Sequence, residues 1–245
     1  FLNDEQWYAD NGITLHKGKE VVELNRRKRE VKTSDNMTVA YDRLLLATGS
    51  LPVIIPLPGH ELEGVVSFRS IQDVYQMLEI SAKHKHAVVI GGGLLGLEAA
   101  NGLMQQGMSV TVVHLLDTLM ERQLDKTAGD LLRQSLEKRG MRFLMSTATE
   151  KILGTERVTG VLFKDGTEVQ ADMVVMAVGI RPNIALAQKA HIYCDKGIVV
   201  NDTLQTYDAR IYAVGECVQH RNQVYGLVAP LFTQAKVCAN HLAQL

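Results

Sequence analysis

The most specific chemistry in this sequence lies in a short run of glycines. Residues 91–96 read Gly-Gly-Gly-Leu-Leu-Gly, a G-x-G-x-x-G pattern that follows an apolar run and opens a segment with helical spacing. In that context the pattern is typical of a dinucleotide-binding loop. Gly91 permits the tight turn, Gly93 lets a pyrophosphate approach the backbone, and Gly96 lets the helix pack closely on the strand.

The helix after the loop supplies the other binding groups that such a site needs. Leu94 and Leu95 occupy its first turn, where the backbone N–H groups are free and the helix dipole is positive. The alternative interpretation is a glycine-rich turn that binds nothing. The order of strand, helix and second strand around the loop favours the binding site.

A histidine stands where a dinucleotide site usually carries an acid. The second strand, "SVTVVHLL", reaches His114 at the position where Asp or Glu normally accepts the ribose 2′-hydroxyl. An imidazole does not repel a 2′-phosphate as a carboxylate does, so the choice between NADH and NADPH stays open. We expect His114 to lie at the ribose. The alternative is a histidine that only faces solvent.

The chain repeats one pattern. The segments "DRLLLATGSLP" at 42–52 and "DMVVMAVGIRP" at 172–182 share an acidic residue, an apolar run and an exit through glycine. A β-rich segment with a polar turn precedes each copy. We interpret the repeat as the second half of a Rossmann-type domain present twice, because two dinucleotide domains each need one strand exit.

The elements around these motifs predict an α/β fold. Strands and helices alternate after residue 86, which indicates a parallel sheet with helices on its faces, and Asp165-Gly166 marks a hairpin turn. We therefore expect two Rossmann-like domains, three-layered, each with a parallel sheet and a β-meander. The predicted helices cover residues 70–83, 94–106, 125–139 and 230–244; the predicted strands cover 86–90, 109–116, 173–179 and 210–216.

Composition excludes several classes of function. The net charge of the 245 residues is -1, with Lys+Arg 26 and Asp+Glu 27, so neither nucleic acid nor a membrane surface is an expected partner. No apolar run approaches the roughly 18 residues that span a bilayer. The three cysteines are widely spaced, which argues against a disulfide framework or a metal site and fits a reducing cytoplasm.

The glycine loop, the two exits and "TYDARIYAVGE" together resemble the pyridine nucleotide–disulfide oxidoreductase superfamily. The resemblance covers essentially the whole chain and implies an NAD(P)H domain inserted into an FAD domain. It implies cofactor contacts from the first exit at Thr48 and Gly49, and from the second at Val178 and Gly179.

The same resemblance assigns the C-terminal part to FAD. It implies that "IYAVGE", ending in Gly215 and Glu216, binds the ribityl chain of FAD, with Glu where the superfamily usually has Asp. It implies that the helix beginning near Pro230 faces the flavin. It also implies that Glu98 orients the nicotinamide as the catalytic residue; the alternative is a charge on the helix face. Cys217 is interpreted as a small buried residue.

A closer resemblance is to the large subunit of NAD(P)H-dependent nitrite reductase, carried by residues 86–103, 110–114 and 119–125. It implies hydride transfer from NAD(P)H to FAD, with electrons passing through Fe–S centres to sirohaem in a longer parent chain. The alternatives are a ferredoxin or rubredoxin reductase or an NADH oxidase of the same fold, and a nucleotide-binding module without turnover. The oligomeric state does not follow from these residues.

We predict a first FAD portion at 1–66, an NAD(P)H domain at 67–190 and a second FAD portion at 191–245. Applying the interval between Gly91 and Gly179 to Gly49 places the first glycine of an FAD loop before Phe1. We therefore expect that the N-terminal part of the FAD domain is missing, and that the chain holds FAD weakly.

Overall fold

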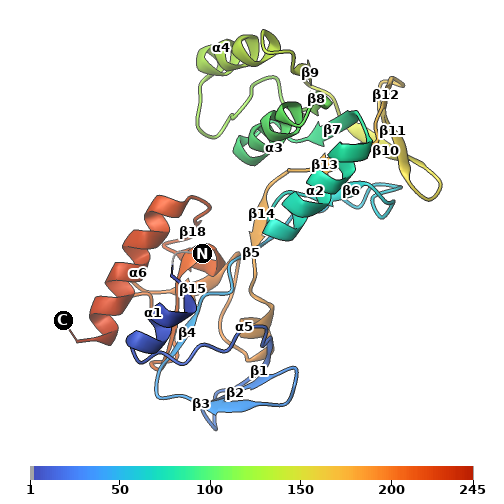
Figure 1. The fold of residues 1–245 in the computed structure, drawn as a ribbon. Helices are drawn as coiled ribbons and strands as arrows, with labels where there is room; N and C mark the ends of the chain where they lie inside the picture. Colours follow the sequence, from blue (N-terminus) through green and yellow to red (C-terminus); the bar gives the residue numbers. More distant parts are fainter. Residues whose placement is uncertain (1–2, 245) are drawn as a thin grey trace. The chain divides into compact units, whose positions relative to one another are not determined.

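The computed structural model describes residues 3–244, which form two compact units (Figure 1). The inserted unit comprises Leu51–Arg181. The host unit comprises the residues up to Ser50 and those from Pro182 onward. The inserted unit is thus one continuous segment, and the host unit consists of the two segments on either side of it in the sequence. No helix in the described part of the chain is long and apolar enough to cross a membrane.

The inserted unit is built on a sheet in which all neighbouring strands run parallel. The strand order is β6-β13-β7-β8-β9, so the exit strand β13 has a neighbour on each side. Strands in such a position are buried on both faces and read as continuous apolar runs, as β7, β8 and β13 do. The strands are β6 (Val65–Ser67), β7 (His86–Ile90), β8 (Ser109–Val113), β9 (Arg142–Leu144) and β13 (Met173–Met176).

Side chains along β7 alternate between two cores. Ala87 and Val89 belong to a core completed by helices, whereas Val88 and Ile90 belong to a core completed by the antiparallel β10-β11-β12 meander. The layers are therefore helices, sheet and meander, as the sequence predicts (Figure 1). The elements are α2 (Ile71–Lys83), α3 (Leu94–Gln105), α4 (Lys126–Glu137), β10 (Thr149–Gly154), β11 (Val158–Phe163) and β12 (Glu168–Gln170).

The three helices of the inserted unit begin differently. Helix α2 begins with a capping box, in which Ser70 and Asp73 each accept a backbone N–H from the other. Helix α4 begins at Asp125, whose carboxylate accepts the N–H of Ala128. Helix α3 begins at Gly93, which has no side chain to accept a bond. Only α3 among these three leaves its first turn without a side-chain cap.

The described residues of the host unit form three small sheets. The strands β1-β2-β3 form an antiparallel meander, β4 pairs in parallel with β16, and β15-β17-β18 form the third sheet. Its core includes Leu46, Ile198 and Ile211. The elements are α1 (Glu5–Asp10), β1 (Val21–Asn25), β2 (Glu30–Thr33), β3 (Thr38–Ala40), β4 (Leu44–Leu46), α5 (Ala185–Lys189), β15 (Ile198–Val200), β16 (Ile211–Ala213), the 3-10 turn η1 (Gly215–Cys217), β17 (Val218–His220), β18 (Gln223–Val224) and α6 (Val228–Leu242).

The internal repeat is confirmed strand by strand. The successive elements β3, β4 and β5 (Ser50–Pro52) correspond to β12, β13 and β14 (Ile180–Pro182). The turn of each meander is closed in the same way: the Thr33 N–H donates to Met37 O, and the Phe163 N–H donates to Thr167 O, both at 2.9 Å. The two copies therefore share backbone bonding as well as sequence.

The boundaries of the compact units differ from the predicted ones. The sequence analysis placed them after residues 66 and 190, whereas the units divide after Ser50 and Arg181. The proline-rich segment 51–64 packs on the inserted unit, where the Ile152 N–H donates to Pro58 O at 2.9 Å. Helix α5 contributes Ala187 to the core of the host unit. The bounds of the compact units thus follow packing, and the predicted domain bounds stay a prediction.

Candidate dinucleotide-binding site

Two glycines of the loop between β7 and α3 are required by the fold itself. Gly91 has φ +120°, and a Cβ atom there would lie 2.3 Å from the carbonyl oxygen of Ala177. A Cβ atom on Gly96 would lie 1.9 Å from the carbonyl oxygen of Gly91. Because both neighbours are backbone atoms, a side chain at either position would displace the main chain. These are the positions expected for the tight turn and the close helix packing.

Gly93 differs from the other two. Its backbone is extended, with φ −83° and ψ −177°, and nothing lies within 4 Å of the place a Cβ atom would occupy. The fold therefore does not require glycine here, and the space beside this backbone is open. Gly93 is also the N-cap of α3, whose first N–H groups have no partner inside the helix. An open backbone beside an uncapped helix N-terminus is the arrangement that binds a pyrophosphate.

The exit of β13 lies beside this loop. The Ala177 N–H donates to Ile90 O at 2.9 Å, which aligns the end of β13 with the end of β7. The next two residues, Val178 and Gly179, continue past the loop, and Gly179 is exposed with φ +120°. The predicted residues of the inserted unit thus gather at the carboxyl ends of its central strands, where open parallel sheets bind ligands.

Helix α3 presents three more predicted residues. Leu94, in its first turn, is 40% exposed, and Leu95 is half-buried. Glu98 lies one turn beyond Leu94 and is exposed. No described residue forms a hydrogen bond or an ion pair with Glu98, so its carboxylate has no structural partner in this part of the chain.

His114 lies at the end of β8, as predicted, but its ring points into the protein. The residue is only 9% exposed. Its Nδ1 accepts the N–H of Gly92 at 3.0 Å, and its Nε2 lies 3.1 Å from Thr118 O and 3.3 Å from a carboxylate oxygen of Glu121. Neither ring nitrogen is left over for a ribose hydroxyl. The solvent-facing alternative does not describe this side chain either.

Gly92 is a residue that the sequence analysis did not select. A Cβ atom there would lie 2.8 Å from Cγ of His114 and 2.7 Å from Cδ2 of Leu119. The loop pattern needs glycine at its first, third and sixth positions only. The run of three consecutive glycines was the available signal, because the middle one has no role in the pattern. Its role is to admit the histidine ring beneath the loop.

The predicted residues at the exit of β4 are joined to those at the exit of β16. The Thr48 hydroxyl donates to Asn183 O at 2.6 Å, and Gly49 has φ +67°. The hydroxyl of Ser50, which was not predicted, donates to a carboxylate oxygen of Glu216 at 2.7 Å. The two strand exits of the host unit therefore converge on the carboxylate expected at the ribityl chain.

Helix α6 is tied to the same place. The N–H of Gly215, which has φ +87°, donates to the side-chain oxygen of Gln234 at 3.1 Å. Pro230 lies in the first turn of α6, where its missing N–H costs no helical hydrogen bond. The N-cap residue, Leu227, offers no side-chain bond. As in α3, the first turn of α6 has no side-chain cap.

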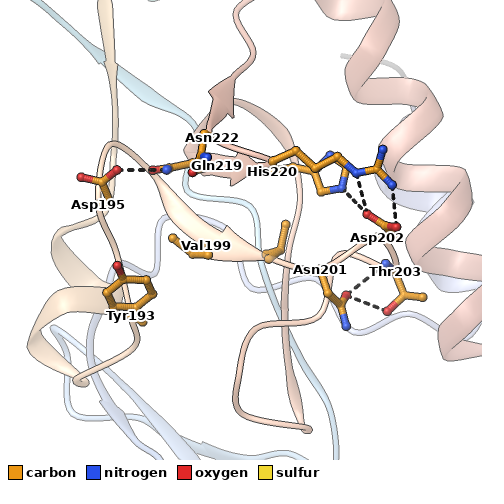
Figure 2. A pocket seen from close by; sticks show the side chains of 11 residues that line it. Tyr193, Asp195, Val199, Asn201, Asp202, Thr203, Gln219, His220 and Asn222 are labelled. Carbon is orange, nitrogen blue, oxygen red and sulfur yellow. Dashed lines mark hydrogen bonds and ion pairs between the residues drawn. The ribbon is translucent and has the colours of Figure 1, made fainter.

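A cavity of about 590 Å³ in the host unit contains none of the predicted site residues. It lies over β15 and β17. Figure 2 shows His220 bonded to Asp202 and Gln219 bonded to Asp195. The Arg221 guanidinium also donates to Asp202. The Arg221 guanidinium, followed by His220, lowers the pKa of Asp202 to about 2. The carboxylate of Asp202 is thus paired with the Arg221 guanidinium within the cavity wall.

No disulfide joins the cysteines of the described residues. All three are free thiols, and no group of three metal-ligating side chains occurs there. Cys217 is fully buried, and its thiol donates to Val214 O. Burial, with a smaller contribution from Cys217, raises the pKa of Cys194 to about 11. A thiol in that state is a poor nucleophile at neutral pH.

The fold and the loop define a class of protein with an α/β unit for a pyridine nucleotide inserted into a second unit of related construction. The family model described as pyridine nucleotide-disulphide oxidoreductase matches residues 5–235. The chain belongs to this family, whose members use NAD(P)H and FAD.

Comparison with known sequences points to one branch of the family. The chain is 54% identical over 241 residues to "Nitrite reductase [NAD(P)H]" of Bacillus subtilis, covering 98% of this chain and 30% of that protein. It is 38% identical to the "Nitrite reductase (NADH) large subunit" of Escherichia coli, over 97% of this chain and 29% of the relative. The chain thus spans less than a third of the length of these relatives.

Solved structures confirm the fold. A ferredoxin reductase from Rhodopseudomonas palustris superposes with a TM-score of 0.93 at 27% identity, over 99% of this chain and 61% of that one. A reductase in a covalent complex of putidaredoxin reductase with putidaredoxin superposes with a TM-score of 0.92 at 30% identity, over 100% of this chain and 61% of that one.

Proposed function

We propose that this chain is the NAD(P)H:FAD reductase part of an NAD(P)H-dependent nitrite reductase that acts in the cytoplasm. The observation that carries the proposal is Gly93, which is glycine although the fold leaves room for a side chain. Because Gly93 has no side chain on the side that faces open space, a ligand can approach its backbone closely. The identity of 54% to a nitrite reductase supplies the branch of the family.

The residues of the inserted unit suit NAD(P)H. The first turn of α3 would bind the pyrophosphate through backbone N–H groups, while the exit at Val178 and Gly179 borders the extended nucleotide. Glu98, exposed and one turn along the helix, is the residue we assign to orienting the nicotinamide. Hydride transfer needs the reacting atoms about 3–3.5 Å apart, so orientation of the ring is the main contribution the protein can make.

The residues of the host unit suit part of FAD. Glu216, held by Ser50, would accept hydroxyl groups of the ribityl chain, and the uncapped first turn of α6 would face the flavin ring. When bound, FAD accepts the hydride and relays the electrons onward. We assign the onward path to Fe–S centres and sirohaem in a longer chain, with nitrite as the final acceptor in nitrate assimilation.

The other electron acceptors remain a second candidate function. An NADH oxidase of Methanocaldococcus jannaschii is 35% identical over 252 residues, and a rubredoxin-NAD(+) reductase of Pseudomonas putida is 31% identical over 248 residues. Oxidation of NADH by the longer protein separates the candidates. Nitrite as the efficient acceptor supports the proposal, whereas turnover with only rubredoxin or oxygen contradicts it.

The nucleotide site is tested by Gly93→Val. The branched side chain would occupy the space for the pyrophosphate, so we expect NADH binding to be lost in titration calorimetry. The fold should survive, because nothing lies within 4 Å of the new Cβ position. Gly102→Val, the same change at an open position further along α3, is the matched control and should bind normally. Tight NADH binding by a folded Gly93→Val variant would overturn the assignment.

A further inference from the structure

We propose that His114 is a positioning residue, which holds the glycine loop in its nucleotide-binding conformation through the backbone of Gly92. This inference rests on the proposed function of the loop. It assigns His114 a role beneath the nucleotide, where the sequence pattern had suggested a direct contact with the ribose.

The hydrogen bonds of the ring define its protonation state. Nδ1 accepts the Gly92 N–H at 3.0 Å and therefore carries no proton. The proton of the neutral ring is then on Nε2, which lies 3.1 Å from Thr118 O and 3.3 Å from a Glu121 carboxylate oxygen. The Gly92 N–H, a donor, faces Nδ1, and the Thr118 carbonyl, an acceptor, faces Nε2; together they hold the imidazole in one tautomer and one orientation.

A second backbone atom of Gly92 is also hydrogen-bonded. The carbonyl oxygen of Gly92 accepts the Met120 N–H at 3.0 Å. Met120 has φ +53°, a left-handed conformation that residues other than glycine rarely adopt. The segment 115–121 thus adopts an unfavourable backbone angle where it reaches the glycine loop. Both polar groups of Gly92 are engaged, one by His114 and one by this segment.

Side-chain packing completes the anchor. Leu119 is 1% exposed and its Cδ2 occupies the space where a Gly92 side chain would be. Gly129 of α4 in turn allows Thr118 to approach, since a Cβ atom there would lie 2.7 Å from the Thr118 methyl group. The ring of His114 is therefore supported by a packed layer that connects the glycine loop to α4.

The anchor matters because Gly92 directly precedes the N-cap of α3. The orientation of its peptide group sets the direction in which Gly93 and the first N–H groups of the helix point. Without an acceptor at Nδ1, the Gly92 N–H would be buried and unsatisfied, which favours rotation of that peptide. Nucleotide affinity should therefore depend on an acceptor at position 114 that does not touch the nucleotide.

Two substitutions isolate the acceptor. In His114→Asn, the side-chain oxygen can take the place of Nδ1, whereas His114→Leu keeps a similar volume without an acceptor. We expect His114→Leu to weaken NADH binding about tenfold, the effect of one lost hydrogen bond, and His114→Asn to stay within about threefold of the wild type. The measurement is NADH titration of the 245-residue chain, with melting temperatures recorded in parallel. His86→Leu, at the other end of the strand β7, is the control.

A double-mutant cycle keeps the test decisive if His114→Leu folds poorly. The methyl group of Gly92→Ala would press on the His114 ring, so this single substitution should also weaken NADH binding. The double variant should lose no more affinity than the single variant that binds NADH less tightly. If the wild type binds NADH and a folded His114→Leu or Gly92→Ala variant binds it with the same affinity, the role of His114 is overturned while the proposed function stands. Absence of NADH binding in the wild type would overturn the proposed function, and this inference with it.

Discussion

The exits of β4 and β13 have matching sequences and different surroundings. Val175, in the middle of β13, is fully buried, whereas its counterpart Leu45 in β4 is 44% exposed. The strand β13 pairs with β6 on one edge and β7 on the other. Within the described residues, β4 pairs only with β16. The same apolar run is thus a core strand in one unit and an edge strand in the other.

The acidic residue before each exit shows the same difference. Asp172 accepts the backbone N–H groups of Lys85 and His86, at the start of β7. Its counterpart Asp42 is exposed. Among the described residues, β4 therefore has no neighbour that corresponds to β7, the strand that pairs with β13 and carries the glycine loop. A repeated sequence thus predicts the hydrogen bonds that a strand can make, and the neighbouring strands decide whether those bonds form.

The largest expected effect of this asymmetry is on cofactor binding. The 245 residues contain one G-x-G-x-x-G loop, in the inserted unit. We predict that the 245-residue chain binds NADH and retains FAD weakly or not at all, because no second such loop occurs among these residues. Flavin absorbance after purification, with and without added FAD, measures this. Stoichiometric, tightly held FAD in a chain whose mass is verified would contradict the prediction.

A matched pair of core substitutions comes next. Val175→Ala removes two buried methyl groups from β13 and should lower the free energy of unfolding by about 2–3 kcal/mol. Leu45→Ala, at the equivalent place in β4, should change it by less than about 1 kcal/mol because the side chain is half exposed. Urea denaturation of both variants provides the comparison. Equal losses would mean that β4 is as well covered as β13.

The smallest effect concerns the two aspartates. Burial opposes ionisation of Asp172, but the N–H donors of His86 and Lys85 outweigh it and leave its pKa below the ordinary 3.8. A lowered folded-state pKa contributes stability above the unfolded-state pKa, and this contribution is lost as pH falls through the folded-state value.

We therefore expect Asp172→Asn to cost about 1–2 kcal/mol at pH 7 and much less in strong acid. Asp42→Asn should change stability by less than about 0.5 kcal/mol at either pH. Denaturation at two pH values tests the pair. A pH-independent loss in Asp172→Asn would show that the carboxylate charge is not what stabilises this junction.

The parts of the site that could be predicted are those specified by local sequence. The glycine loop was recognisable because backbone atoms leave no room for a side chain at Gly91 or Gly96, which fixes the distance between these two glycines in the sequence. The repeat was recognisable because the residues of both meander turns and both exits are similar. Position along the strand also placed His114 at the end of β8.

The parts that could not be predicted depend on segments that meet only in the folded chain. The direction of the His114 ring depends on Gly92 and on Met120, which has a left-handed backbone conformation. Neither residue is one of the fixed positions of the G-x-G-x-x-G pattern. Ser50 and Gln234 reach the Glu216 exit through contacts across 166 and 19 positions of the chain. The bounds of the compact units depend on such contacts as well, since the 51–64 segment packs against residues near 152.

The paired strands β5 and β14 have an evolutionary consequence. The chain enters the inserted unit through β5 and leaves it through β14, and these strands form a two-stranded sheet. Just beyond the pair, the Val53 N–H donates to Gly179 O at 3.0 Å. A segment whose two ends lie side by side can be gained or exchanged within a host at little cost in loop closure. The strand pair therefore makes residues 51–181 a segment that could be inserted into a host, or removed from it, with little rearrangement of the host chain.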